Sequence, residues 1–131
     1  MGDTAKHKEH PVGILVADDH RGMRDLLQKV LHRQGYEVET AKDGIAALDK
    51  MATSRFAIGI LDICMPGMGG VEVMLRLREN CPEVKIILIT AFSTLMTPED
   101  ACRLGAVALL EKPVSLPDLR ALLRRILPPP S

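Results

Sequence analysis

The sequence predicts a one-domain α/β protein in which a parallel β-sheet is covered by helices on both faces. Short apolar runs alternate five times with stretches whose apolar residues recur at helical spacing, which is the pattern of right-handed β-α-β units. With 131 residues, 47% of them hydrophobic, the chain can bury one core of ordinary size. Four of the apolar runs stop at residues able to hold a phosphoryl group or its metal ion. We therefore expect a ligand site at the sheet edge where the strands end.

Five apolar runs are the predicted strands, and the stretches between them carry helix start and stop signals. The second run is short and mixed, as an edge strand would be. Gly35 suits the end of the helix before it, and Asp43 can cap the helix after it. The expected strands cover residues 12–17, 36–40, 58–61, 86–89 and 107–110, and the expected helices lie at about residues 23–34, 43–53, 71–80, 97–105 and 115–127.

Local signals also define the third loop and the last two helices. Residues 64–70 contain one proline and three glycines, which predict a loop of the kind used where a backbone passes close to a ligand. Thr97 and Ser115 each stand three residues before an acid, with proline in the first turn, so both are expected N-caps. Gly105 is expected to end the fourth helix, and the prolines at 128–130 to end the fifth.

Charge and composition exclude several classes of function. Lys plus Arg equals Asp plus Glu at 17 each, so we expect no direct binding of nucleic acid by this chain. The three cysteines form no C-x-x-C pair, which fits reduced thiols, and no segment resembles a membrane span or a signal peptide, so we expect a cytoplasmic protein without membrane contact. Residues 1–11 are expected to form a flexible arm, 12–127 the domain, and 128–131 a tail or the start of a linker.

The polar residues at the strand ends predict a phosphoryl-transfer site. Asp62 is ionised at neutral pH and can act as the nucleophile that forms an aspartyl phosphate. Three carboxylates repel a phosphoryl donor, so we expect Mg²⁺ between them, bound by Asp19 and Asp62, with Asp18 reaching the ion through water. Lys112 would contact the phosphoryl oxygens, and the hydroxyl of Thr90 would detect the added group.

Four motifs in chain order resemble the receiver domain of bacterial two-component response regulators, over about residues 12–127. The motifs are the pair Asp18-Asp19, the segment from Leu61 to Gly70, the pair Thr90-Ala91, and the stretch from Gly105 to Lys112-Pro113. One such motif is weak, but four in order at strand ends are specific. The resemblance implies a flavodoxin-like three-layer sandwich, with a five-stranded parallel sheet in the order 2-1-3-4-5 flanked by five helices.

The resemblance also implies the chemistry of phosphorylation. It makes Asp62 the acceptor of a phosphoryl group from a histidine kinase, a phosphotransfer protein or a small phosphodonor, in a reaction that needs Mg²⁺ or Mn²⁺. Asp18 and Asp19 correspond to the acidic pair that holds the ion, and the backbone carbonyl of Cys64 to a further ligand. The chain would then be a phosphoacceptor that assists its own phosphorylation and dephosphorylation, and not a turnover enzyme.

A switch is the third implication of the resemblance. Thr90 corresponds to the switch hydroxyl and Lys112 to the phosphate-binding lysine, whose bond to Pro113 is usually cis in the family. Phosphorylation is expected to change the surface formed by the fourth helix, the fifth strand and the fifth helix, through which such domains often form homodimers.

Three positions depart from the family pattern or tune it. Leu109 occupies a position that usually carries Phe or Tyr, so we expect weakened but surviving coupling, of about 1 kcal/mol. Cys64 and Phe92 occupy the positions that tend to set the rate of dephosphorylation in the family. Neither side chain positions an attacking water well, and a bulky Phe92 could screen the acyl phosphate, so we expect slow self-dephosphorylation.

Other functions fit parts of the sequence. An FMN-binding protein shares the predicted architecture, but this chain has an acidic pair where the FMN phosphate would bind, no Trp and one Tyr. A metal-dependent phosphohydrolase would need a second Asp two residues after Asp62 as its acid/base, and this chain has Cys64 there. A receiver-like module that interacts constitutively, without phospho-switching, is a third alternative, which Leu109 favours.

The histidines contribute little to the prediction. His20 follows the acidic pair, and we weigh a role near the acidic pocket against simple exposure at the start of a helix, which we favour. His7 and His10 fall in the expected flexible arm and are not assigned to a metal site.

Overall fold

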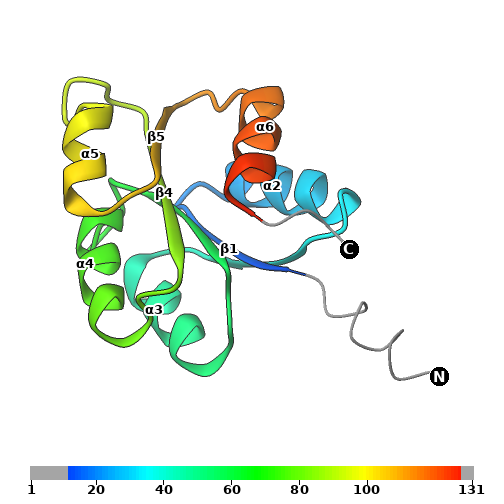
Figure 1. Ribbon diagram of the computed structural model, residues 1–131, viewed down its shortest axis with the longest axis horizontal. Helices are drawn as coiled ribbons and strands as arrows, with labels where there is room; N and C mark the ends of the chain where they lie inside the picture. The colour runs from blue at the N-terminus through cyan, green and yellow to red at the C-terminus, as the bar shows by residue number, and fades with distance from the viewer. Residues whose placement is uncertain (1–11, 128–131) are drawn as a thin grey trace.

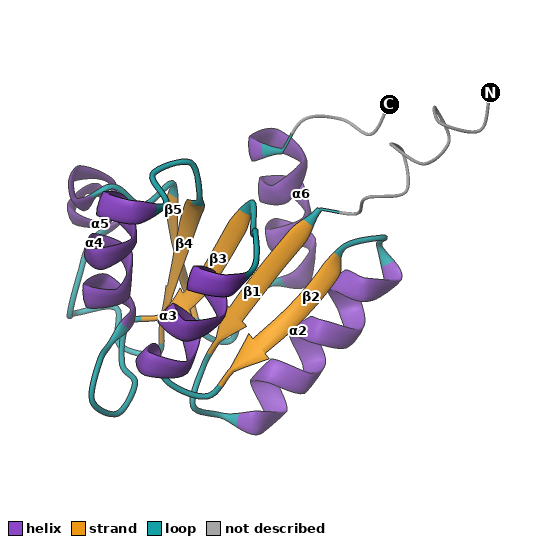
Figure 2. Ribbon diagram, turned by 90° about the horizontal axis from the view of Figure 1, so that it is seen from below, coloured by secondary structure: helices purple, strands orange, loops and turns teal. Residues whose placement is uncertain are grey.

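The computed structural model describes residues 12–127, and these form a three-layer α/β sandwich (Figure 1). The expected arm at 1–11 and the expected tail at 128–131 lie outside the described residues. Five parallel strands form one sheet in the order β2-β1-β3-β4-β5, as the resemblance implied (Figure 2). The strands are β1 (Gly13–Ala17), β2 (Glu37–Ala41), β3 (Ile58–Asp62), β4 (Lys85–Thr90) and β5 (Ala108–Glu111).

Backbone pairing fixes the register and brings the carboxyl ends of the strands to one edge. β3 lies at the centre and is buried at all five of its positions, which explains its continuous apolar run. Asp62, the last residue of β3, pairs with Ile89 of β4, and Thr90 pairs with Glu111 of β5. The ends of β3, β4 and β5 therefore lie side by side at the same edge.

Three of the helices begin at the caps that the sequence predicts, which are Asp43, Thr97 and Ser115. Asp43 accepts a hydrogen bond from the backbone N–H of Ala46 at 2.8 Å, and Thr97 forms a complete capping box with Asp100. Gly105 ends its helix in the left-handed region at φ 116°, which a β-carbon would disfavour. The helices are α2 (Arg21–Arg33), α3 (Gly44–Thr53), α4 (Gly70–Asn80), α5 (Pro98–Leu104) and α6 (Leu116–Ile126).

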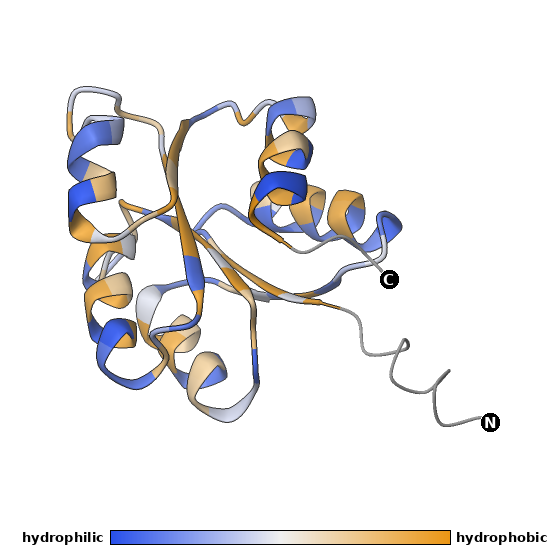
Figure 3. Cartoon of the chain, viewed as in Figure 1, coloured by the Kyte–Doolittle hydropathy of each residue, from blue (hydrophilic) through white to orange (hydrophobic). Residues whose placement is uncertain are grey.

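Two hydrophobic cores hold the layers together, one on each face of the sheet. Helices α3, α4 and α5 cover one face, where Leu61 and Leu88 belong to the core. Helices α2 and α6 cover the other, where Ile60 and Ile87 belong to the core. Consecutive strand residues thus point to opposite cores, and Figure 3 shows mostly apolar colour along the strands and both polar and apolar colour on the helices. In the part of the chain described here, no helix combines the length and apolarity that a membrane span requires.

Candidate functional site

The carboxyl ends of three strands bring the predicted polar residues into one pocket. Asp18 directly follows β1, Asp62 ends β3, and Lys112 directly follows β5. The side chains of Asp18 and Asp62 are 0% and 4% exposed, so both carboxylates are withdrawn from water. Buried carboxylates need a positive partner, because an uncompensated buried charge is strongly destabilising.

Lys112 is that partner for both carboxylates. Its Nζ lies 2.8 Å from Oδ2 of Asp18 and 2.8 Å from Oδ2 of Asp62, although the two aspartates come from different strands. Burial alone lowers the pKa of Lys112, but its hydrogen bonds to Asp18 and Asp62, together with their charges, outweigh burial and raise that pKa above its ordinary value. The backbone N–H of Lys112 donates to the carbonyl of Thr90 at 2.7 Å, and its peptide bond to Pro113 is cis.

The turn after β1 is held by several hydrogen bonds. The backbone N–H of His20 donates to Oδ1 of Asp18 at 2.8 Å, and the guanidinium of Arg24 donates to the carbonyl of Asp18 at 2.8 Å. The N-cap of α2 is His20, whose side chain makes no capping hydrogen bond. The acidic pair is therefore not a helix cap: Asp18 faces the pocket, and Asp19 is half-exposed beside it.

The residues present fit a divalent cation. Ligand atoms of Asp18, Asp19, His20 and Asp62 all lie within 4.8 Å of one another. Oδ2 of Asp18 is buried, and among the described residues its only polar partner is the ammonium of Lys112 at 2.8 Å. One ammonium among three carboxylates leaves an excess of negative charge, and carboxylate oxygens are the donors that Mg²⁺ prefers. The pocket can therefore bind such an ion.

The loop after β3 is packed tightly enough to shape the pocket. The backbone N–H of Cys64 donates to Oδ1 of Asp62 at 3.0 Å, so both oxygens of this carboxylate have a donor. A β-carbon on Gly70, at the start of α4, would lie 2.6 Å from the carbonyl oxygen of Asp62. A β-carbon on Gly44 would lie 2.3 Å from the carbonyl oxygen of Met68. The glycines therefore allow backbone to contact backbone behind Asp62.

Thr90 is buried, and its hydroxyl is engaged within its own loop. Its Oγ1 accepts from the backbone N–H of Phe92 at 2.9 Å and lies 3.2 Å from the carbonyl oxygen of Phe92, to which it can donate. Phe92 itself is 56% exposed. Leu109 is half-buried and packs against the core beneath α3, α4 and α5. The hydroxyl must leave the carbonyl oxygen of Phe92 before it can donate a hydrogen bond to another acceptor.

His20 lies against the acidic pair, which the sequence interpretation did not favour. Its Nδ1 is 3.2 Å from Oδ1 of Asp18 and 3.3 Å from Oδ1 of Asp19, while 71% of the side chain is exposed. The expected exposure at the helix start is confirmed, and the structure also places the ring beside the acidic pocket, which was the alternative that the sequence left open. The only sequence signal was its place directly after the two acids.

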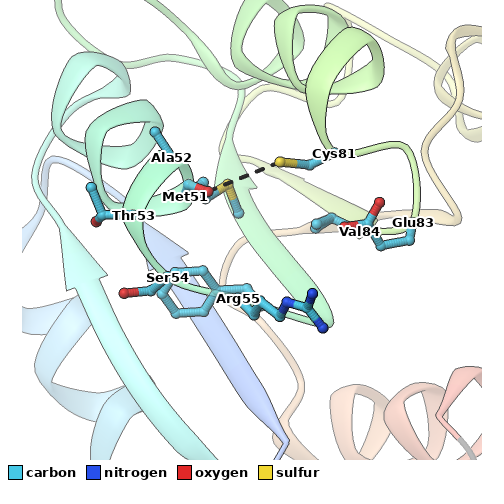
Figure 4. A pocket seen from close by; sticks show the side chains of 9 residues that line it. Met51, Ala52, Thr53, Ser54, Arg55, Cys81, Glu83 and Val84 are labelled. Carbon is cyan, nitrogen blue, oxygen red and sulfur yellow. Dashed lines mark hydrogen bonds between the residues drawn. The ribbon is translucent and has the colours of Figure 1, made fainter.

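A separate cavity lies at the opposite edge of the sheet (Figure 4). It has a volume of about 270 Å³ and lies between the C-terminal ends of α3 and α4, before β3 and β4 begin. Its lining includes Arg55 and Glu83, and the thiol of Cys81 points to the carbonyl of Met51 at 3.9 Å. None of the predicted site residues lines this cavity. The acidic pocket is therefore the candidate site.

Fold and pocket together define a class: a doubly wound α/β domain that can hold a divalent cation and a phosphoryl group at the carboxyl edge of its sheet. The family described as the response regulator receiver domain matches residues 14–124. The chain belongs to this family, whose members are phosphorylation-dependent signalling modules of two-component systems.

Individual relatives and solved structures agree with the assignment. Response regulator MprA from Mycobacterium sp. (strain KMS) is 40% identical over 122 residues, which cover 90% of this chain and 53% of that protein. This chain thus spans about half the length of MprA. Sporulation initiation phosphotransferase F from Bacillus subtilis is 32% identical, covering 88% of this chain and 93% of that protein. The response regulator TrrA from Thermotoga maritima, solved in complex with Mg²⁺ and BeF, is 34% identical, with a TM-score of 0.80 over 88% of this chain and 99% of that one.

Proposed function

We propose that Asp62 accepts a phosphoryl group from a phosphohistidine of a kinase or phosphotransfer protein, or from a small donor such as acetyl phosphate. A carboxylate oxygen forms the new O–P bond, the P–N bond of the phosphohistidine breaks, and the departing imidazole nitrogen keeps the electron pair and takes up a proton. The observation that carries the proposal is the buried Asp62 carboxylate held by Lys112 at 2.8 Å on one oxygen and by the N–H of Cys64 at 3.0 Å on the other.

The neighbouring residues would lower the electrostatic barrier. Asp18, Asp19, Asp62 and the backbone carbonyl of Cys64 would hold Mg²⁺ or Mn²⁺, which supplies positive charge to the phosphoryl oxygens. Lys112 already bears its charge beside Asp62, so it can transfer its contact from the carboxylate to a phosphoryl oxygen without moving far. The chain would act only on its own Asp62, which makes it a phosphoacceptor rather than a turnover enzyme.

The output would depend on Thr90. A phosphoryl group adds about 1.5 to 2 negative charges, which can draw the Thr90 hydroxyl away from Phe92 and move the loop before α5. The affected surface would be α5, β5 and α6, and homodimerisation through it would be the expected response. Leu109 lacks the ring that usually accompanies this movement, so coupling of about 1 kcal/mol is expected.

Two side chains near the acceptor would set the lifetime of the phosphorylated state. Cys64 and Phe92 offer no carboxylate or amide to orient an attacking water, so self-dephosphorylation should be slow. The decay of phosphorylated protein in excess Mg²⁺ tests this expectation, and complete loss within seconds would contradict it.

A cytoplasmic protein that binds neither membrane nor nucleic acid fits the balanced charge of the chain.

Phosphorylation by acetyl phosphate tests the proposal directly. Wild-type protein with Mg²⁺ should gain the mass of one phosphoryl group, and Asp62→Asn should gain none. Asp49→Asn is the matched control, because Asp49 is exposed on α3. Chelation of the metal should prevent the gain in every variant. If wild-type protein folds and binds Mg²⁺ but is never phosphorylated, the alternative of a constitutive interaction module is favoured instead.

A further inference from the structure

His20 presents a ring nitrogen to the acidic pocket from a fixed position. Its backbone is extended, at φ −90° and ψ 116°, and its N–H is bonded to Asp18. Its Nδ1 lies 3.2 Å and 3.3 Å from one carboxylate oxygen of each residue in the acidic pair. Most of the ring lies in water, so the Nδ1 edge is the part of the side chain that the pocket holds.

These separations match those between ligands of one metal ion. In an octahedral site with bonds of about 2.1 Å, neighbouring ligand atoms lie about 3.0 Å apart and opposite ones about 4.2 Å apart. The two contacts of Nδ1 are close to the first distance. The whole group of Asp18, Asp19, His20 and Asp62 lies within 4.8 Å, slightly more than the second distance, so a small inward movement would bring these ligand atoms around one ion. Oδ2 of Asp18 is buried, and its only polar partner among the described residues is the ammonium of Lys112, so one positive charge stands among three carboxylates and a divalent cation would supply more.

We propose that Nδ1 of His20 is a metal ligand, which makes this pocket a mixed nitrogen and oxygen site that prefers borderline divalent ions over Mg²⁺. The inference rests on the proposed function, because it concerns the same metal. Mg²⁺ takes oxygen ligands, whereas imidazole nitrogen suits Ni²⁺ and Zn²⁺, which also bind more tightly in general. His20 must be neutral at Nδ1 to act in this way, with its proton on Nε2 toward water.

A competing explanation assigns His20 only a hydrogen-bonding role. In that case Nδ1 carries a proton that it donates to Asp18 or Asp19, and the ring moves aside when a metal enters. The two explanations differ in one observable: only a ligand places a nitrogen nucleus in direct contact with the ion. Spin-echo modulation from ¹⁴N around bound Mn²⁺ detects such a nitrogen without reference to phosphorylation.

The test compares the wild-type chain with His20→Asn and the matched control His32→Asn, which replaces an exposed histidine at the other end of α2. All three proteins, including the one called wild type in this test, carry replacements of His7 and His10, which removes stray metal binding by those residues. We expect ¹⁴N modulation in wild type and in His32→Asn but not in His20→Asn. Loss of the nitrogen ligand should weaken Ni²⁺ binding about tenfold and leave Mg²⁺ binding within about threefold.

Each outcome decides between the explanations. If wild-type protein binds Mn²⁺ without ¹⁴N modulation, or if His20→Asn keeps the wild-type ratio of Ni²⁺ to Mg²⁺ affinity, then His20 is not a ligand, and the proposed function still stands. If wild-type protein binds neither Mg²⁺ nor Mn²⁺ and acetyl phosphate leaves Asp62 unmodified, the proposed function fails together with this inference.

Discussion

Replacing Lys112 by methionine is the sharpest test of how the pocket is held together. Methionine keeps most of the apolar stem and removes the ammonium group. Asp18 and Asp62, whose side chains are 0% and 4% exposed, would then share a buried pocket with no cation between them. We expect the metal-free variant to be clearly less stable than wild type at neutral pH, because each carboxylate loses its compensating charge.

The magnitude follows from the geometry. A contact of 2.8 Å corresponds to an attraction of about 6 kcal/mol at an effective dielectric of 20, and Lys112 makes two such contacts. Desolvation of the three groups cancels most of this energy in the intact pocket. Breaking a buried pair nevertheless costs about 3 to 5 kcal/mol, and the 13% exposure of the Lys112 side chain places the loss at about 3 kcal/mol.

The assay is urea unfolding followed by circular dichroism, since the chain has no Trp for fluorescence. Because the pKa of Lys112 is raised, its contribution is fully present below the unfolded value of about 10.4 and is lost as the pH rises through the folded value. Wild type should therefore lose stability above about pH 10.4, and Lys112→Met should lack this loss. Added Mg²⁺ should stabilise the variant more than wild type, because it replaces the missing charge.

Lys29→Met, at an exposed position of α2, is the control and should change stability by less than about 0.5 kcal/mol. The reasoning is refuted if Lys112→Met also stays within 1 kcal/mol of wild type without metal, using the threshold of about 1 kcal/mol for exposed pairs. It is refuted as well if both proteins lose stability equally in alkali.

Three further changes test the packing and the switch. Gly70→Ala should destabilise the fold by about 2 kcal/mol in the same urea titration, since its new β-carbon would lie 2.6 Å from a carbonyl oxygen. Gly22→Ala is the control: its β-carbon meets nothing within 4 Å in helix α2, so it should leave stability unchanged or raise it slightly. Thr97→Ala should cost about 1 kcal/mol by removing the cap of α5, and unchanged amide exchange in α5 would contradict this. Leu109→Tyr should enlarge the chemical-shift changes in α5 and β5 on beryllofluoride addition, and wild-type changes confined to the pocket of Asp62 would show that no coupling survives.

Local chemistry made most of the fold predictable. The caps at Asp43 and Thr97 and the helix end at Gly105 were predicted, because each satisfies backbone groups within a few residues. The predicted ends of the strands differ from the observed ends by one residue at several positions. Glu111, for example, joins β5 because it pairs with Thr90, and Lys85 joins β4 because it pairs with Ile58, although neither lies in an apolar run. Such pairing depends on the neighbouring strand, which a local pattern does not contain.

The site was predictable in composition but not in its contacts. Asp62 and Lys112 lie 50 residues apart, and their contact required the strand order, which came from the family resemblance rather than from periodicity. The position of His20 depends on the turn after β1, where the Asp18 carbonyl is fixed by Arg24. The hydrogen bonds between Thr90 and Phe92 were also not predicted, because they depend on the loop conformation.

The contacts of Thr90 allow two properties to evolve independently: the free energy needed to release its hydroxyl, and the side chain that residue 92 presents to partner proteins. Both partners of the Thr90 hydroxyl are main-chain atoms of Phe92, so these two hydrogen bonds do not need any particular side chain at position 92. The exposed aromatic ring can therefore be replaced by another side chain that suits a new protein partner, while the free energy needed to break the hydrogen bonds of Thr90 is retained. In a cell with many such regulators, partner recognition by this loop could change without releasing the Thr90 hydroxyl in the absence of phosphorylation.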